Sequence, residues 1–286
     1  YSAGYSSGNL TCNSNCTLNT SACVSSGIQT CPSISQYGIT WTFASPVVCG
    51  QFANDDWWVQ GPVTITGISP PSTTTGGRTI NGSMINPGVT SLTQGYDSDT
   101  YGQYKIPAYY SSELNVADGV SVSSPLIVQP GSSLISSISN PTSGVRPQLD
   151  SVSVLTVLSS PAPSGSFRPS YVGNNKSIQF NKSDLDYSKL SNLSSVGGPP
   201  SFSYVQSPFS RVWLEHVPCT GGFERYLFPA VTGFDGYGRE YSEIVGEASL
   251  LLNLNYSNAQ KEALLIDLVQ VGIDNMGIID NGGKSQ

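Results

Sequence analysis

Charged side chains are scarce in this sequence. Lys, Arg, Asp and Glu together make up 11% of the 286 residues, against about 25% in an average soluble protein. The first charged residue is Asp55, so every residue before it is uncharged. Because charge usually keeps protein surfaces solvated and apart, this chain needs another means. Covalently attached sugar and burial against another subunit are the two alternatives.

The sequence also lacks basic clusters and long apolar runs. Its net charge is −7 and it has no run of Lys or Arg, which argues against nucleic acid as a partner because phosphates require basic patches. No apolar stretch approaches the roughly 20 residues that span a bilayer, so we predict no membrane span. The chain begins at Tyr1 rather than Met, and its cysteines imply export. We therefore expect that a signal peptide has been removed and that the protein is extracellular or at the cell surface.

Catalytic motifs are missing too. His216 is the one histidine, so any Ser-His-Asp triad would have to use it. No Gly-x-Ser-x-Gly elbow is present, and a histidine beside Trp213 and Glu215 is more often structural. The glycine-rich stretches lack phosphate-binding spacing. We assign no catalytic residue and predict that the protein is not an enzyme.

Six cysteines are present, and all but one lie near the N-terminus. An even number in an exported chain favours disulfide bonds, with the pairing left open. Zinc is the competing hypothesis, but no histidine lies near the N-terminal cysteines and no second Cys-x-x-Cys pair follows, so no metal site is predicted. If all six pair, the one downstream cysteine must bond to the N-terminal group. The predicted disulfide cysteines are Cys12, Cys16, Cys23, Cys31, Cys49 and Cys219.

N-glycosylation sequons, Asn-x-Ser or Asn-x-Thr, are frequent in the chain. Chance would give about four at this composition, and the sequence has twice as many; Asn140 does not count because Pro141 follows it. They concentrate in the uncharged N-terminal region and in the polar stretch 174–195, which are the regions that need solvation without charge. The predicted glycosylation sites are Asn9, Asn15, Asn19, Asn81, Asn175, Asn181, Asn192 and Asn255.

Hydrophobic patterning divides the chain into four predicted regions. Residues 1–36 show little periodicity and form a disulfide-rich arm of Cys, Ser and Asn. From 37 to 160, short apolar runs are separated by turn residues, and Ile39–Phe43 alternates apolar and polar residues as a half-buried strand does. This pattern predicts a mainly β domain, an antiparallel β-sandwich. Residues 161–238 are irregular, rich in Ser, Pro and aromatic residues, and are expected to pack on the core.

The last region, 239–286, has helical periodicity. Apolar residues between Tyr241 and Leu252 predict one helix, and Ser257 with Gln260 forms a capping box for a second. The two helices make a C-terminal αα-hairpin whose connection carries the sequon of Asn255. The second helix has an apolar face that the sandwich or a neighbouring subunit must cover. That face comprises Leu264, Leu265, Leu268, Val269, Gly272, Ile273 and Met276.

Two acidic motifs could bind ligands. Asp55, Asp56, Trp57 and Trp58 place carboxylates beside aromatic rings. That combination is typical of sugar clefts, and equally of a loop leading into a strand whose tryptophans enter the core. The Asp-Ser-Asp motif at 97–99 resembles the start of a calcium loop but lacks the downstream Gly and Glu of an EF-hand. We expect no cofactor beyond covalent glycans; a structural calcium ion at this motif is the alternative.

Two stretches resemble an uncharacterised family of secreted microbial proteins. They are Ile39–Phe43 followed by Gly50–Ile65, which reads GQFANDDWWVQGPVTI, and the later Asn258–Ile266. The resemblance covers most of 38–283 and implies no catalytic residues. Members of that family are longer and continue past the Gly-Gly pair at 282–283. The overall profile, with small residues, many sequons and a cysteine-bearing arm, also resembles subunits of glycan-coated extracellular filaments.

Together these features predict a structural, self-assembling extracellular glycoprotein. Its subunits are expected to associate head to tail into a fibre or surface layer, a homopolymer whose partners are other copies of itself and glycans. Exchange of the arm or of a strand between neighbours is the expected route. The alternative is a secreted carbohydrate-binding or carbohydrate-cleaving protein that uses Asp55, Asp56 and the adjacent tryptophans.

Overall fold

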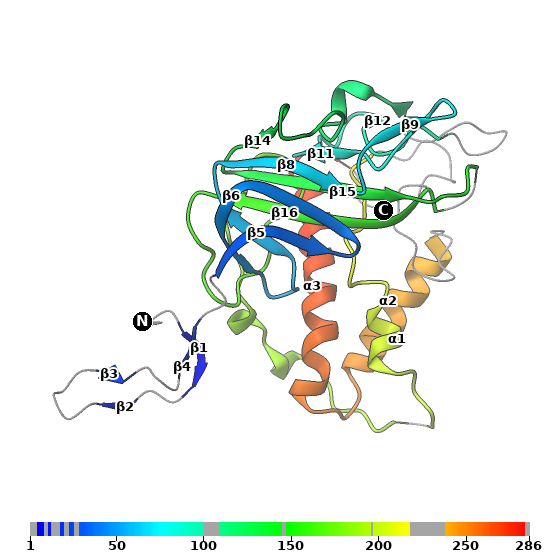
Figure 1. Ribbon diagram of the computed structural model, residues 1–286. Helices are drawn as coiled ribbons and strands as arrows, with labels where there is room; N and C mark the ends of the chain where they lie inside the picture. The colour runs from blue at the N-terminus through cyan, green and yellow to red at the C-terminus, as the bar shows by residue number, and fades with distance from the viewer. Residues whose placement is uncertain are drawn as a thin grey trace.

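The computed structural model describes residues 5–8, 11–12, 18–19, 23–25, 29–99, 109–144, 147–195, 197–217 and 238–283. The described chain is mainly β, with helices toward its C-terminus (Figure 1). An eight-stranded sheet forms the body, in the order β11-β15-β16-β7-β6-β8-β14, with β5 paired to β6. Its strands are β5 (Gln29–Gln36), β6 (Ile39–Gln51), β7 (Trp57–Gln60), β8 (Val63–Ser69), β11 (Ser83–Ile85), β14 (Leu126–Val128), β15 (Ser132–Ser139) and β16 (Leu149–Leu158).

Strand β6 curls the sheet because it changes neighbours along its length. Thr40–Phe43 pairs with β8, whereas Cys49–Gln51 pairs with β7. Its partner β5 follows both halves, with a register shift between them. Pro46 lies in the stretch between the paired segments, where its missing amide N–H interrupts no ladder. The predicted alternation is confirmed in the first half of β6, where Ile39, Trp41 and Phe43 are buried.

The sheet is mixed, and the prediction of an antiparallel sandwich is not confirmed. Strands β7 and β16 run parallel, from Trp57 opposite Leu155 to Gln60 opposite Leu158. The other strand pairs of this sheet are antiparallel. Parallel neighbours need a long connection. Here β16 reaches the side of β7 only after the chain has formed several other elements between the two strands. Evenly spaced turn signals describe neighbours in sequence, so they contain no information about this pairing.

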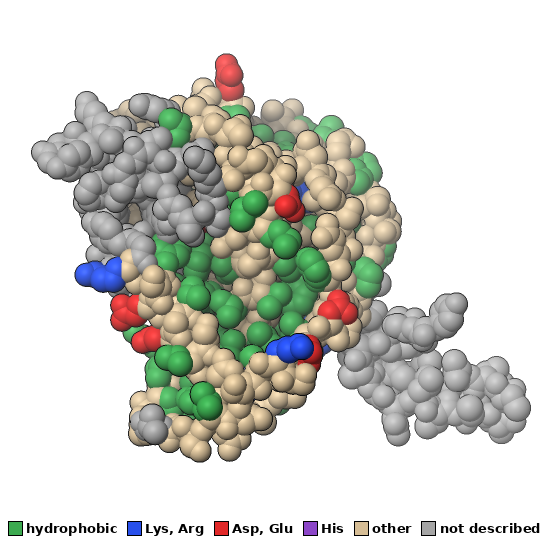
Figure 2. Space-filling model, turned by 180° about the vertical axis from the view of Figure 1, so that it is seen from behind, with side chains coloured by type: hydrophobic (Ala, Val, Ile, Leu, Met, Phe, Trp, Pro, Cys, Tyr) green, Lys and Arg blue, Asp and Glu red, His purple; other side chains and the backbone are tan. Residues whose placement is uncertain are grey.

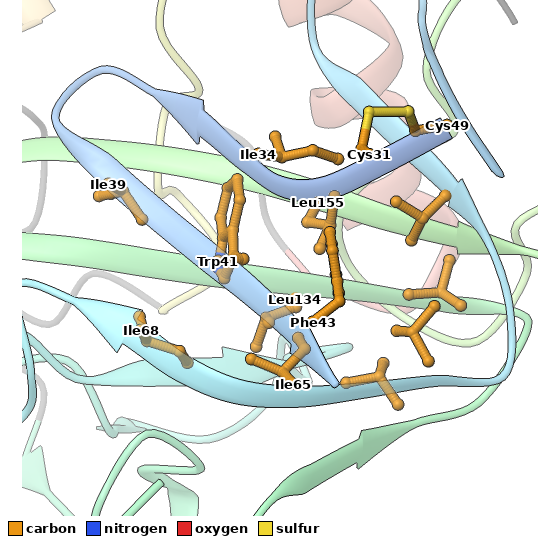
Figure 3. Close-up of a cluster of buried hydrophobic side chains, with 14 of the residues drawn as sticks. Cys31, Ile34, Ile39, Trp41, Phe43, Cys49, Ile65, Ile68, Leu134 and Leu155 are labelled. Atoms are coloured by element: carbon orange, nitrogen blue, oxygen red, sulfur yellow. A yellow bond between two sulfur atoms is a disulfide. The ribbon is translucent and has the colours of Figure 1, made fainter. Parts of the chain in front are cut away.

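The main core lies inside the curl of the sheet. Trp41 and Ile34 from one side meet Leu134 and Leu155 from the other (Figure 3). Trp41 is fully buried, and its indole Nε1 donates a hydrogen bond of 2.9 Å to Oγ of Ser136, which satisfies the one polar atom of a large apolar ring. Apolar burial therefore holds the two sides of the curl together.

A second core covers the opposite face of β15 and β16. Ile135, Val152 and Val154 point away from the first core and pack with Tyr171 and Ile278. Strand β16 is consequently buried along almost all of its length. Two-sided burial explains why this strand is the richest in β-branched and apolar residues.

The helices form a third layer behind the sheet. They are α1 (Phe202–Gln206), α2 (Gly238–Leu252) and α3 (Asn258–Asp280), with short 3-10 turns η1 (Ser112–Leu114), η2 (Lys182–Asp184) and η3 (Tyr187–Lys189). The predicted capping box of α3 is confirmed, with Ser257 and Gln260 each bonding the backbone of the other. In Figure 1, the C-terminal part of α3 passes behind the sheet. No helix in the described ranges combines the length and hydropathy needed to cross a bilayer.

The remaining strands form small pairs outside the main sheet. Near the sheet are β9 (Thr73–Thr75) with β10 (Arg78–Ile80) and β12 (Thr93–Gln94) with β13 (Tyr109–Tyr110). In the N-terminal arm, β1 (Tyr5–Gly8) pairs with β4 (Cys23–Ser25), and β2 (Thr11–Cys12) pairs with β3 (Leu18–Asn19). Residues 29–36, which the sequence pattern assigned to the arm, instead form β5 of the main sheet because Ile34 and Cys31 reach its core.

Candidate functional site

The motif at 55–58 lies in the turn from β6 to β7. The backbone N–H of Phe52 donates to the carbonyl of Asp56 (2.8 Å), and Asp55 occupies a left-handed backbone conformation (φ 64°). Trp58 is only 2% exposed and packs with Phe52 in a small core. Trp57 is half-buried against the main core. Of the two readings of this motif, the structure favours the strand whose tryptophan enters the core.

Asp56 belongs to a buried ion cluster that joins three parts of the chain. Arg168 donates from Nε to Oδ2 of Asp56 (2.5 Å) and, with both Nη atoms, to the carboxylate of Asp274 in α3 (3.0 and 2.6 Å). Burial alone would lower the pKa of Arg168, but the two carboxylates raise it above its ordinary value. Burial raises the pKa of Asp274 and Arg168 opposes that shift. The guanidinium is thus bonded to two carboxylates at once, which is the geometry that a buried ion cluster requires.

Gln270 fastens the same region of α3 to the backbone of Arg168. Its side chain accepts from the Arg168 N–H (3.0 Å) and donates to the Arg168 carbonyl (3.1 Å). Gln36 of β5 and Asn54 donate to Asp56 (3.1 and 2.8 Å). The cluster therefore ties sheet, connecting segment and helix together, which is a structural role.

Sequence reasoning missed this cluster because its members lie far apart in the chain. A signal existed in α3, where Asp267, Gln270 and Asp274 recur at i, i+3 and i+7 and so share one helix face. All three are buried. Polar residues repeated on one face of an otherwise apolar helix indicate a buried polar network, whose partner a lone arginine such as Arg168 can supply.

Asp267 is the member of this face that titrates near neutrality. Its Oδ2 accepts a hydrogen bond of 2.7 Å from Nε2 of Gln206 in α1. Burial raises the pKa of Asp267 to about 7; the Gln206 bond opposes the shift, and the negative charges of Asp56 and Asp55 add to it.

His216 is buried between two tyrosines. Its Nδ1 lies 3.3 Å from the hydroxyl of Tyr171, and its ring makes edge contacts with Tyr96 and Tyr171. Burial lowers the pKa of His216 to about 3, so the ring is neutral at physiological pH. A buried neutral imidazole bonded to a tyrosine matches the structural interpretation of this residue rather than a catalytic triad.

The acidic motif at 97–99 surrounds an arginine. Arg78 donates from Nε and Nη2 to Asp97 (3.1 and 2.8 Å) and lies 3.8 Å from Asp99. Ser143 and the N–H of Gly144 also donate to Asp99. The guanidinium supplies the positive charge for which the sequence pattern proposed calcium. In the part of the chain that the structure describes, no group of three or more His, Cys, Asp or Glu is arranged to hold a metal ion.

One predicted disulfide is present in the described residues. Cys31 of β5 bonds to Cys49 of β6, with Cα atoms 6.1 Å apart. The bond links these two strands of the curled sheet at the main core (Figure 3). Cys12 and Cys23 lie in β2 and β4, whereas Cys16 and Cys219 lie outside the described residues. The pairing of these four stays a prediction.

The predicted sequons differ in their access to solvent. Asn81 is 9% exposed; its Oδ1 accepts from the N–H of Ser139 and its Nδ2 donates to the carbonyl of Pro71. Asn181 is half-buried and caps η2, with Nδ2 donating to the carbonyl of Ser164. Asn175, Asn192 and Asn255 are exposed.

Of the other sequons, Asn19 lies in β3, and Asn9 and Asn15 lie outside the described residues. Occupancy of every sequon remains a prediction.

The outer face of α3 is apolar and open. Met276 is 51% and Ile279 57% exposed, although both are large hydrophobic side chains. Met276 lines a groove of about 210 Å³ between α3 and residues 167–180, together with Ile273, Phe180 and polar residues that include Asn175 and Asp280. Figure 2 shows hydrophobic side chains gathered over the middle of this face. We call this groove, with Phe180, Ile273 and Met276 as its apolar lining, the α3 groove.

No protein-family model, curated protein or solved structure matches this chain. The function is therefore argued from the surfaces and contacts of the chain itself.

Proposed function

We propose that this chain is the subunit of an extracellular, glycosylated polymer, in which copies associate head to tail into a fibre or surface layer. The observation that carries the proposal is the orientation of α3. The helix buries Asp267, Gln270 and Asp274 against the body and turns Met276 and Ile279 outward. Exposed apolar area is worth about 25 cal/mol per Å² when covered, so this face favours a partner.

The N-terminal arm of a second copy is the occupant we propose for the α3 groove. The arm is uncharged, so it brings no charge of its own that would have to be desolvated in the groove. Strands β1 to β4 of the arm pair with one another rather than with the main sheet, and in Figure 1 they lie apart from the body. Each copy then offers one arm and one groove. A contact between two different surfaces propagates unless rotation closes a ring.

The carbohydrate-binding alternative has weaker support. A sugar-binding site at 55–58 needs aromatic rings with exposed faces, but Trp58 is buried in a core. The carboxylate of Asp56 is already bonded to Arg168. Trp57, which is half-buried, is the one ring of the motif with exposed area. A glycan array probed with the purified protein tests this alternative, and binding lost in Trp57→Ala with unchanged folding would revive it.

The assembly proposal is tested with variants of each surface. Met276→Glu places a charge in the α3 groove, and Leu18→Asp with Val24→Asp places charges in the arm. Leu250→Glu is the matched control, because Leu250 is 67% exposed on α2, outside the groove lining. We expect the first two variants to stay monomeric and the control to assemble like the wild type, all with wild-type circular dichroism.

Mixing the two assembly-defective variants sharpens the test. The groove variant still donates an arm, and the arm variant still offers a groove, so a mixture should form a one-to-one dimer and stop there. Sedimentation velocity distinguishes this dimer from monomers and from polymer. Polymer formation by the separate variants, or a mixture that stays monomeric, would contradict the arm-in-groove contact.

A further inference from the structure

Two sequons that are distant in sequence are adjacent in the fold. Leu193 pairs with Leu254 in an isolated parallel bridge. The N–H of Leu193 donates to the carbonyl of Asn253 (2.9 Å), and the N–H of Asn255 donates to the carbonyl of Leu193 (2.9 Å). Asn192 and Asn255 therefore flank one pair of backbone hydrogen bonds, at the connection between α2 and α3.

Both acceptor side chains are accessible. Asn192 and Asn255 are exposed, and neither amide makes a hydrogen bond within the described residues. Asn81 differs on both counts, because its amide is buried and bonded, and the Ser83 hydroxyl of the same sequon is buried against Ser136. The Asn181 amide nitrogen donates to the carbonyl of Ser164, and its oxygen accepts from the N–H of Ser183 as the cap of η2. Geometry thus separates sequons that the sequence pattern treats as equal.

We propose that Asn192 and Asn255 form a paired N-glycan site at the α2–α3 connection, and that Asn81 remains unmodified. In each transfer, the side-chain amide nitrogen attacks the anomeric carbon of a lipid-linked oligosaccharide diphosphate. A C–N bond forms, the C–O bond to the diphosphate breaks, one amide proton passes to a base of the transferase, and the lipid diphosphate leaves. Exposed Leu193 then lies between the two attachment points, where the sugars shield it from solvent.

The paired site lies away from the α3 groove. Asn255 comes just before α3 begins, and Met276 is 18 residues beyond Asn258 on that helix, which corresponds to roughly 27 Å at about 1.5 Å per residue. Sugars at the pair would therefore project from one end of the helical layer, away from the groove, whereas the sequon of Asn175 lies in the groove lining itself. The inference deepens the proposed function, because it places this pair of glycans and the subunit contact at opposite ends of α3.

The test is site-resolved mass spectrometry of the full chain purified from its native source. Enzymatic release of N-glycans in ¹⁸O-water converts each modified Asn to labelled Asp. We expect label at Asn192 and Asn255 and none at Asn81. Label at Asn81, or absence of label from both members of the pair, would overturn the proposal.

Intact-mass analysis tests whether the two sugars coexist. In a host that glycosylates the wild type, Asn192→Gln and Asn255→Gln should each remove one glycan mass, and the double variant should remove two. Loss of only one glycan mass in the double variant would show that the sites exclude each other and would contradict the pair. Sedimentation velocity of the double variant reports on assembly separately, so a failure of the glycan site is distinguishable from a failure of polymer formation.

Discussion

The sheet and the helical layer of this protein are stabilised in different ways. The curled sheet encloses apolar side chains, and its largest buried ring, Trp41, has its one polar atom bonded to Ser136. The helical layer is attached to the sheet through the Arg168 ion cluster and through Ile278 in the second core, and it leaves apolar Met276 and Ile279 outside. The sheet completes its own core, whereas the helical layer presents an apolar face that another surface can cover.

We expect the largest loss of stability when the buried ion cluster is broken. Arg168→Ala leaves the carboxylates of Asp56 and Asp274 buried without their partner, so we expect a loss of about 3–5 kcal/mol in unfolding free energy. Urea unfolding measures it. Lys182→Ala is the matched control, because the Lys182–Glu262 pair is exposed and should contribute less than about 1 kcal/mol. Equal losses in the two variants would contradict the difference between buried and surface pairs.

Removal of the Cys31–Cys49 disulfide tests the sheet side of the comparison. The bond closes a loop with a sequence separation of 18, for which chain entropy gives about 3 kcal/mol. The Cys31→Ala, Cys49→Ala double variant should therefore lose roughly that amount in a denaturant melt. Reduction of the wild type should reproduce most of the loss. If the double variant matches the wild type in stability, the disulfide does not support the curl.

Asp267→Asn should have a smaller effect that depends on pH. The pKa of Asp267 is raised from 3.8 to about 7, so the folded state retains a proton that the unfolded state releases. Its contribution to stability is present below about pH 4 and is lost as the pH rises through about 7. The variant should therefore exceed the wild type by at least about 1 kcal/mol at pH 8 and match it near pH 4.

The pKa of Lys176 is shifted downward, opposite to that of Asp267, but its contribution to stability cancels when the Asp267→Asn variant is compared with the wild type. Burial lowers the pKa of Lys176 to about 7, with the positive charge of Arg168 adding to the shift and Asp274 opposing it. Comparing variant and wild type at the same pH removes this shared contribution. A constant difference across pH 4–8 would contradict the assignment to Asp267.

Local patterns in the sequence predicted local structure well. Alternation identified the first half of β6, and the box at Ser257 and Gln260 identified the start of α3, because both signals depend on neighbouring residues. The β7–β16 pairing and the Asp56–Arg168–Asp274 cluster depend on segments about 100 residues apart, and no local pattern records them. The sequon of Asn81 illustrates the same limit, since a three-residue motif contains no information on burial.

The orientation of α3 was predicted only in part. Leu264 of the predicted apolar face is buried, but Met276 of the same face is exposed. The reason is that the face carrying Asp267, Gln270 and Asp274 turns inward to meet Arg168 and Gln206. Ionic partners elsewhere in the chain thus decided which side of the helix faces solvent.

Electron microscopy of the full-length glycosylated protein is the most direct test of the central claim. The account predicts unbranched fibres or a continuous layer built from one repeating subunit, and their loss in Met276→Glu but not in Leu250→Glu. Isolated, monodisperse particles at every protein concentration, with the same appearance in both variants, would contradict it.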